Sequence, residues 1–181
     1  MKPIGPLMRE HRLIERMIVL LRDELVSIEE NSRASISLID AGVDLFRTYA
    51  DRTHHGKEED ILFRDLARKD LADEHKLTMD ELVQEHLYAR RKVRELVAAR
   101  DRYVGGDTEA LGKMKENLQD LISFYPVHIQ KEDKRFFFAS MEYLDRQEQD
   151  AMLEEFADFD RRMIHEKYGT LIESFEKLGH S

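Results

Sequence analysis

The sequence predicts an all-α protein, an up-down-up-down four-helix bundle with an additional C-terminal helical segment. Apolar residues recur at intervals of three and four along most of the chain, which is the period of a helix with one buried face. Only 8 glycines and 3 prolines interrupt the 181 residues, and 37% of the residues are charged, a balance typical of helix-rich soluble domains. We therefore expect one domain over residues 1–181, with the bundle at about 6–142 and the C-terminal helix at about 145–178.

The first two helices are expected to form one hairpin. The first begins at Pro6, because proline suits the first turn of a helix, and it ends near Glu30 before a polar junction. The second begins near Ser35 and runs to a break over residues 69–74. Both carry an apolar stripe along their length, so each should bury one face against the others.

The next two helices repeat this arrangement. The third ends at Gly105-Gly106, a strong helix terminator, and Asp107 or Thr108 caps the fourth. Pro126 lies inside the fourth helix and removes one backbone hydrogen bond, so a kink is expected there.

A fifth helical segment follows, with Asp145 as its N-cap. Asp158 and Asp160 interrupt its apolar pattern, so the helix is expected to bend or break at these residues. The Phe136-Phe137-Phe138 run before it is interpreted as core plus a cover for the fifth segment, with the surface of a homodimer as the alternative.

Composition excludes several kinds of function. The chain has no cysteine, which removes disulfides, thiolate catalysis, zinc fingers and iron–sulfur clusters. Its formal net charge of -9 repels phosphate backbones, so nucleic acid is not an expected partner. No apolar run approaches the roughly 20 residues that span a bilayer, and no signal peptide is recognisable. A cytoplasmic protein without a membrane partner is expected.

Six residues form the candidate metal site, because each is a His or Glu that falls on the apolar face of its helix. They are His11, His54, Glu58, His86, His128 and Glu132. Four of them belong to two His-x-x-x-Glu segments, in which the His and the Glu lie one helical turn apart on one face. Such a pair can hold a common ion.

The spacing of these residues along the chain predicts that they meet. Each His or His-x-x-x-Glu pair lies about 20 to 24 positions from the nearest hairpin turn, near residue 32 or residue 106. At the rise of an α-helix, this places all of them roughly 30 to 36 Å from the turns. An up-down-up-down bundle would bring them into one layer.

The residue types indicate which cations the layer would hold. A buried carboxylate without a partner costs several kcal/mol, so two inward glutamates require protons or cations. Nitrogen and oxygen ligands without sulfur suit iron, and zinc or manganese accept the same ligands. Two glutamates on opposite helices can bridge two ions, which favours a dinuclear site.

The adjacent pair His54-His55 needs one assignment. His54 lies at helical spacing from Ala50 and Ile61, whereas the neighbours of His55 at the same spacing are charged. We therefore expect His54 to face the core and His55 to face solvent.

Other polar residues have simpler expected roles. His75 and His180 are expected to be solvated. Glu59 and Asp133 are interpreted as surface charges or as groups that orient the imidazoles. Arg90 is expected to reach a carboxylate. Tyr125 is expected to pack in the core, with contact to the centre or its ligand as the alternative.

The chain resembles the hemerythrin-like, or HHE cation-binding, proteins over about residues 6–140. The matching positions are Glu10-His11, the segment from His54 to Phe63, Glu85-His86 and the segment from His128 to Asp133. The resemblance implies a helical bundle that holds two iron ions, bridged by an oxo group or by carboxylates. It also implies that the six candidate residues are the ligands.

Two positions depart from the oxygen-carrying members of that family. Those proteins have a second His one turn after the third-helix His, where this chain has Arg90, and an Asp five positions after the last His, where this chain has Glu132 at four. One terminal imidazole is therefore missing. Our hypothesis is that His165, in the fifth segment, caps or gates the open position.

These observations favour a non-haem di-iron protein that senses or handles oxygen, nitric oxide, peroxide or iron, so the expected partner is a small diatomic ligand or peroxide. The alternatives are a di-iron oxidoreductase, a repair factor that donates iron to damaged iron–sulfur clusters, and a structural bundle with an incidental polar layer. Whether the protein is an enzyme stays open at this stage.

Overall fold

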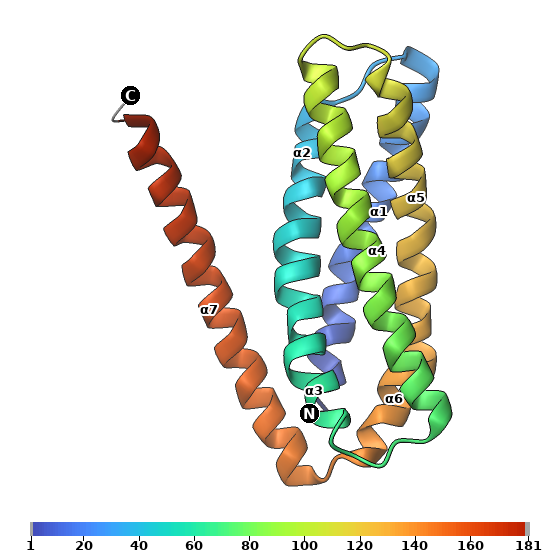
Figure 1. Ribbon diagram of the computed structural model, residues 1–181, viewed down its shortest axis with the longest axis vertical. Helices are drawn as coiled ribbons and strands as arrows, with labels where there is room; N and C mark the ends of the chain where they lie inside the picture. The colour runs from blue at the N-terminus through green and yellow to red at the C-terminus, as the bar shows by residue number, and fades with distance from the viewer. Residues whose placement is uncertain (1, 180–181) are drawn as a thin grey trace.

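The computed structural model describes the backbone of residues 2–179 and the side chains of residues 2–163. Within these residues the chain is all-helical. The long helices of the bundle lie side by side along the long axis of the molecule, and the last helix slants away from them (Figure 1). None of the described helices is both long and apolar enough to cross a membrane.

The first helix, α1, spans Ile4–Asn31. We call each long helical stretch of the bundle a rod, so that α1 is the first rod. The second rod is continuous and is made of four parts: α2 Ile36–Asp44, η1 Leu45–His55, η2 Glu58–Phe63 and α3 Arg64–Leu66. It is followed by α4, Asp73–Val104, which ends before Gly105-Gly106 as expected. Gly106 adopts a φ of 99°, a conformation that glycine tolerates far better than other residues.

The fourth rod begins with α5, Ala110–Lys131, and contains Pro126. It continues through η3 Glu132–Phe136 and α6 Phe137–Ser140 to the short turn η4 Met141–Tyr143. The last helix, α7, spans Arg146–Gly179.

Asp145 begins α7 as the sequence predicts. The backbone N–H of Glu148 donates to Oδ1 of Asp145 at 2.9 Å, and the N–H of Asp145 donates to Oε2 of Glu148 at 2.9 Å. This reciprocal pair is a capping box. The expected break at Asp158 or Asp160 is wrong, because the helix continues through both residues.

The segments η1, η2 and η3 have π-helical rather than α-helical hydrogen bonding. A π turn joins residues i and i+5 and therefore holds more residues than an α turn. Each π segment contains candidate ligands: His54 in η1, Glu58 in η2 and Glu132 in η3. The local widening of the helix is thus concentrated at the candidate site.

The core consists of two apolar clusters separated by the polar layer. On α1, Leu7 belongs to one cluster and Ile14 to the other, and His11 lies between them. On α4, His86 lies in the same way between Leu82 and Ala89. Both imidazoles are fully buried, so the layer is closed above and below by apolar side chains.

Candidate metal centre

The structure brings the predicted residues together in two groups. The first group consists of His11, His54, Glu58 and Glu132, and one potential ligand atom of each lies within 4.8 Å of the others. The second group, within the same limit, consists of His55, His86 and His128. All seven side chains are buried.

In the first group the imidazole nitrogens point at one another and at carboxylate oxygens. His11 Nε2 lies 2.8 Å from His54 Nε2 and 3.1 Å from Glu132 Oε2. His54 Nε2 lies 3.4 Å from Glu58 Oε1. Separations of about 3 Å are expected between neighbouring ligands on one cation at metal–ligand distances of roughly 2.1 Å.

The second group faces the opposite oxygens of the same two carboxylates. His86 Nε2 lies 3.4 Å from Glu58 Oε2 and 3.6 Å from Glu132 Oε1. His128 Nε2 lies 3.3 Å from Glu132 Oε1. Each glutamate therefore presents one oxygen to each histidine group, which is the arrangement that a bridging carboxylate needs.

The buried polar atoms of the site fit a cation better than they fit one another. Both carboxylate oxygens of Glu58, both of Glu132, and Nε2 of His86 and of His128 lack a hydrogen-bond partner and are inaccessible to solvent. Unpaired buried carboxylates are strongly unfavourable. Cations between the two histidine groups would satisfy these atoms, so the residues present fit a metal centre.

His55 does not face solvent, and that prediction is wrong. Its side chain is 1% exposed, and its ring stacks on that of His86 with centroids 3.8 Å apart. The cause is the π-helical geometry of η1: the wider turn brings two consecutive residues, His54 and His55, to the inner face.

Each of the other four imidazoles is held by a carboxylate on its outer side. The four Nδ1–carboxylate pairs are His11–Asp133 at 2.7 Å, His54–Glu10 at 2.8 Å, His86–Glu59 at 2.6 Å and His128–Glu85 at 2.8 Å. In a neutral imidazole, an Nδ1–H that donates to a carboxylate leaves Nε2 unprotonated and aimed at the centre, which is the state a metal ligand requires. Of the two roles considered for Glu59 and Asp133, the structure favours orienting the imidazoles.

A cation in turn binds every one of these outer carboxylates. The pairs are Glu10–Lys57, Asp133–Arg12, Glu59–Arg90 at 2.8 Å and Glu85–Lys131 at 2.5 Å. The predicted role of Arg90 is confirmed, since it contacts Asp51 as well as Glu59. Chains of imidazole, carboxylate and cation therefore surround the centre on four sides.

Lys57 is a site residue that the sequence reasoning missed. It is 0% exposed, and besides Glu10 it contacts Asp160 on α7 at 2.7 Å. The ring of Phe156, also on α7, lies 5.8 Å from its Nζ. A lysine that precedes two glutamates in a charged motif gives no sequence signal for burial, because its burial depends on contacts with α7.

The protonation of the two central carboxyls differs. Burial and the charge of Glu132 raise the pKa of Glu58 well above its usual value. Burial acts on Glu132 in the same direction, but the surrounding imidazoles His128, His11 and His86 outweigh it and hold its pKa well below the usual value. Without a cation, Glu58 therefore keeps a proton while Glu132 is ionised.

The pKa values of the imidazoles also diverge. Burial would lower the pKa of His11, but its hydrogen bond to Asp133 and the Glu132 carboxylate 3.1 Å from its Nε2 raise it to about 9. Burial lowers the pKa of His54 to about 4. Burial, with the nearby charge of His86, lowers the pKa of His55 well below its usual value. At neutral pH, His54 and His55 are thus unprotonated and able to bind a cation.

Aromatic side chains enclose the site. Tyr125 is 2% exposed and stacks on Phe46 with ring centroids 4.9 Å apart, which confirms its packing role. Phe137 stacks on His11 at 5.6 Å. Phe136 is also buried, whereas Phe138 is 53% exposed.

The remaining predicted histidines lie elsewhere. His75 is half-buried rather than solvated, and its Nδ1 lies 2.7 Å from the Tyr143 hydroxyl. The side chain of His165 and residue His180 lie outside the part of the chain that the structure describes. The structure thus leaves the His165 hypothesis untested.

Comparison with known proteins agrees with this geometry. The family model for the hemerythrin HHE cation binding domain matches residues 2–140, the part of the chain that holds all seven clustered side chains. No curated protein and no solved structure matched the chain. On the family match, which covers well over half of its length, the chain belongs to the hemerythrin HHE cation-binding domain family.

Proposed function

We propose that the protein binds two iron ions as a non-haem di-iron protein and uses them to sense or handle oxygen, nitric oxide or peroxide. The observation that carries the proposal is the arrangement of Glu58 and Glu132. Their four buried oxygens lack hydrogen-bond partners and lie between two groups of histidines. Cations would relieve the burial cost of both carboxylates at once.

In this proposal the two ions have different ligand sets. His11 and His54 would hold the first ion. His86 and His128 would hold the second, and we add His55 to this group. Glu58 and Glu132 would each offer one oxygen to either side. The first ion then has fewer imidazoles, which leaves room for a small ligand on that side.

The protein supplies three further contributions. The outer carboxylates keep the imidazoles in one tautomer and orientation. The two apolar clusters exclude water above and below the layer. The iron ions, when bound, supply the redox chemistry and the open coordination position.

The proposal includes an up-down-up-down arrangement of the four rods. Packing of α4 on α5, of α5 on α1 and of α1 on the α2–η1 rod supports it. So do the short connections at residues 32–35, 67–72 and 105–109, which suit antiparallel neighbours.

Metal reconstitution tests the proposal. We expect iron-free protein to take up two Fe(II) per chain under anaerobic conditions, and to hold them against competing zinc and manganese. Visible spectra would then be recorded before and after addition of oxygen, nitric oxide and peroxide. A reversible absorption change indicates binding or sensing, whereas steady consumption of peroxide indicates the alternative, an oxidoreductase. A fully stable protein that takes up none of these metals would contradict both.

A further inference from the structure

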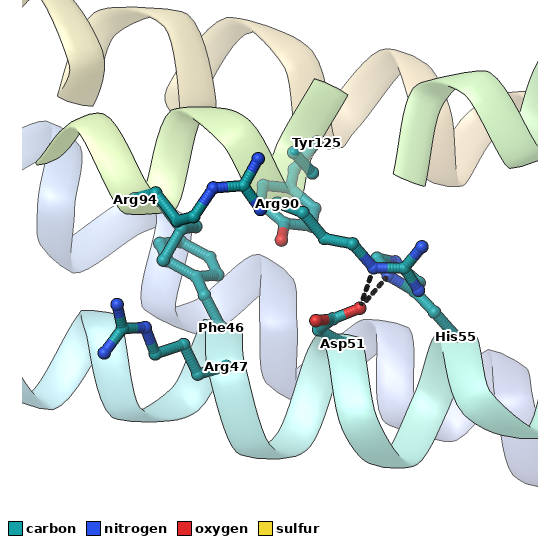
Figure 2. A pocket seen from close by; sticks show the side chains of 9 residues that line it. Phe46, Arg47, Asp51, His55, Arg90, Arg94 and Tyr125 are labelled. Atoms are coloured by element: carbon teal, nitrogen blue, oxygen red, sulfur yellow. Dashed lines mark hydrogen bonds and ion pairs between the residues drawn. The ribbon is translucent and has the colours of Figure 1, made fainter. Parts of the chain in front are cut away.

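A cavity of about 250 Å³ lies directly beside the second histidine group (Figure 2). It opens between the η1 segment and α4, and His55 forms part of its wall. Phe46, Ala89 and Val93 provide apolar surface. The proposed iron function does not use this cavity.

The charge of the cavity wall is opposite to that of the whole chain. Three arginines, Arg47, Arg90 and Arg94, line it together with a single carboxylate, Asp51. Asp51 is already engaged, because Arg90 Nε donates to its Oδ1 at 2.5 Å. In a chain with a net charge of -9, such a local excess of positive charge favours an anion.

Two of these guanidinium groups are available to a ligand. Arg47 and Arg94 are exposed, and neither forms an ion pair or hydrogen bond with the residues that the structure describes. Figure 2 shows both on the side of the cavity away from the Asp51–Arg90 pair. An arginine without an acidic partner can pair with a carboxylate through two parallel N–H bonds.

Tyr125 adds a hydrogen-bond donor to the cavity wall. Its side chain is 2% exposed, and its hydroxyl has no hydrogen-bond partner among the described residues. In Figure 2 this hydroxyl points into the space between Phe46 and Asp51. Burial raises the pKa of Tyr125, so the hydroxyl keeps its proton. The hydroxyl is therefore free to donate a hydrogen bond to an anion in the cavity.

We propose that this cavity binds a small organic monoanion, a carboxylate on an aromatic or short aliphatic body. The carboxylate accepts a hydrogen bond from the Tyr125 hydroxyl and pairs with Arg94 or Arg47. The hydrocarbon body packs on Phe46, which is itself stacked on Tyr125. The site requires no bound iron, so it is independent of the proposed di-iron function, although its ligand would lie next to His55.

Calorimetric titration of the full chain, iron-loaded and iron-free, with benzoate and its neutral analogue benzamide tests the proposal. Benzoate should bind both forms, and benzamide should bind about tenfold more weakly because it lacks the charge-assisted bonds. Tyr125→Phe and Arg94→Gln should each lower the affinity for benzoate by about tenfold, since each removes one hydrogen-bond donor to a charged group. Arg91→Gln is the matched control: it removes an exposed arginine of the same helix that does not line the cavity, and it should have no effect.

Several outcomes would overturn the proposal. Equal affinity for benzoate and benzamide would show that charge plays no part. If Arg91→Gln and Arg94→Gln weakened benzoate binding equally, the net charge of the protein would explain the binding, and Arg94 would have no specific role in the cavity. If benzoate bound only to the iron-loaded protein, its carboxylate would bind the iron ions and not the cavity. Nitrite is an anion without a hydrocarbon body. If it bound as tightly as benzoate, the apolar surface of the cavity would contribute nothing to binding.

Discussion

The ring of His55 lies flat against the ring of His86, with centroids 3.8 Å apart and planes inclined by 10°. His55 comes from η1 and His86 from α4, so the contact joins two neighbouring rods at the level of the candidate metal centre. The oxygen-carrying relatives place an additional imidazole on the third helix, where this chain has Arg90. Here a third imidazole reaches the second histidine group from the adjacent rod.

Replacing His55 should therefore change the metal content. His55→Phe keeps an aromatic ring against His86 but removes the nitrogen donors. We expect iron-loaded protein to retain less than two Fe per chain, with the loss confined to the ion held by His86 and His128. Elemental analysis together with the visible spectrum measures this.

His75→Phe is the matched control for that experiment, because His75 is half-buried and bonded to Tyr143, away from both histidine groups. It should keep its full iron content. Normal iron content in His55→Phe would show that His55 only packs against His86.

The two central glutamates should matter more than their neighbour. Glu58→Gln and Glu132→Gln each remove the charge of a carboxylate that faces both histidine groups, so we expect both variants to lose most of their iron. Glu59→Gln changes only the outer partner of His86, and its amide oxygen can still accept the Nδ1–H bond. Such outer changes typically weaken metal binding by about 10- to 100-fold. Equal iron loss in all three variants would contradict the assigned helix faces.

The sequence predicts much of this site because the apolar period of each helix marks which residues face inward. His11 and His86 interrupt otherwise apolar stripes, and both are buried as expected. The method failed at His55 for a definite reason: it assumes 3.6 residues per turn, and no residue near His54 signals a π turn.

Other features depend on tertiary contacts that no local pattern encodes. Glu10 and Glu85 lie on the flanks of their helices, and only the docked neighbouring helix shows which imidazole each one holds. Lys57 is buried by α7, a helix outside the family match. Packing between rods decides these roles, so a reading of one helix at a time cannot predict them.

Gly56 should be essential for the docking of α7. A Cβ at this position would lie 2.7 Å from Cζ of Phe159, closer than packed atoms tolerate. Gly56→Leu should therefore push α7 away and disrupt the Lys57–Asp160 contact nearby. Overpacking of this kind costs about 1–3 kcal/mol, and urea unfolding measures the loss.

Two further variants show whether the clash is the cause. Gly112→Leu places the same side chain on an exposed helical glycine that has no atom within 4 Å of a Cβ, and it should not destabilise the protein. Phe159→Ala combined with Gly56→Leu should recover part of the loss, because it removes the clashing ring. An unchanged stability of Gly56→Leu would contradict the docking of α7 over this segment.

The stability of the iron-free protein should fall as the pH rises from 6.5 to about 9. The pKa of His11 is raised from 6.5 to about 9, chiefly by its hydrogen bond to Asp133 and by the Glu132 carboxylate 3.1 Å from its Nε2, which together outweigh burial. The folded chain therefore binds this proton more tightly than the unfolded chain does. The resulting stabilisation is complete below pH 6.5 and is lost as the pH rises through the folded pKa, with a magnitude on the order of 3 kcal/mol. The raised pKa of Glu58 acts in the same direction.

Urea unfolding of iron-free protein across this pH range measures the effect, and His11→Gln should flatten it. Iron must displace the protons of His11 and Glu58 in order to bind, because metal ligands have to be deprotonated. Iron uptake at pH 7 should accordingly release protons, and calorimetry in two buffers of different ionisation enthalpy detects them. Iron-free protein whose stability stays constant or rises between pH 6.5 and 9 would contradict the protonated state of His11, because a neutral imidazole bonded to Asp133 loses no proton in this range.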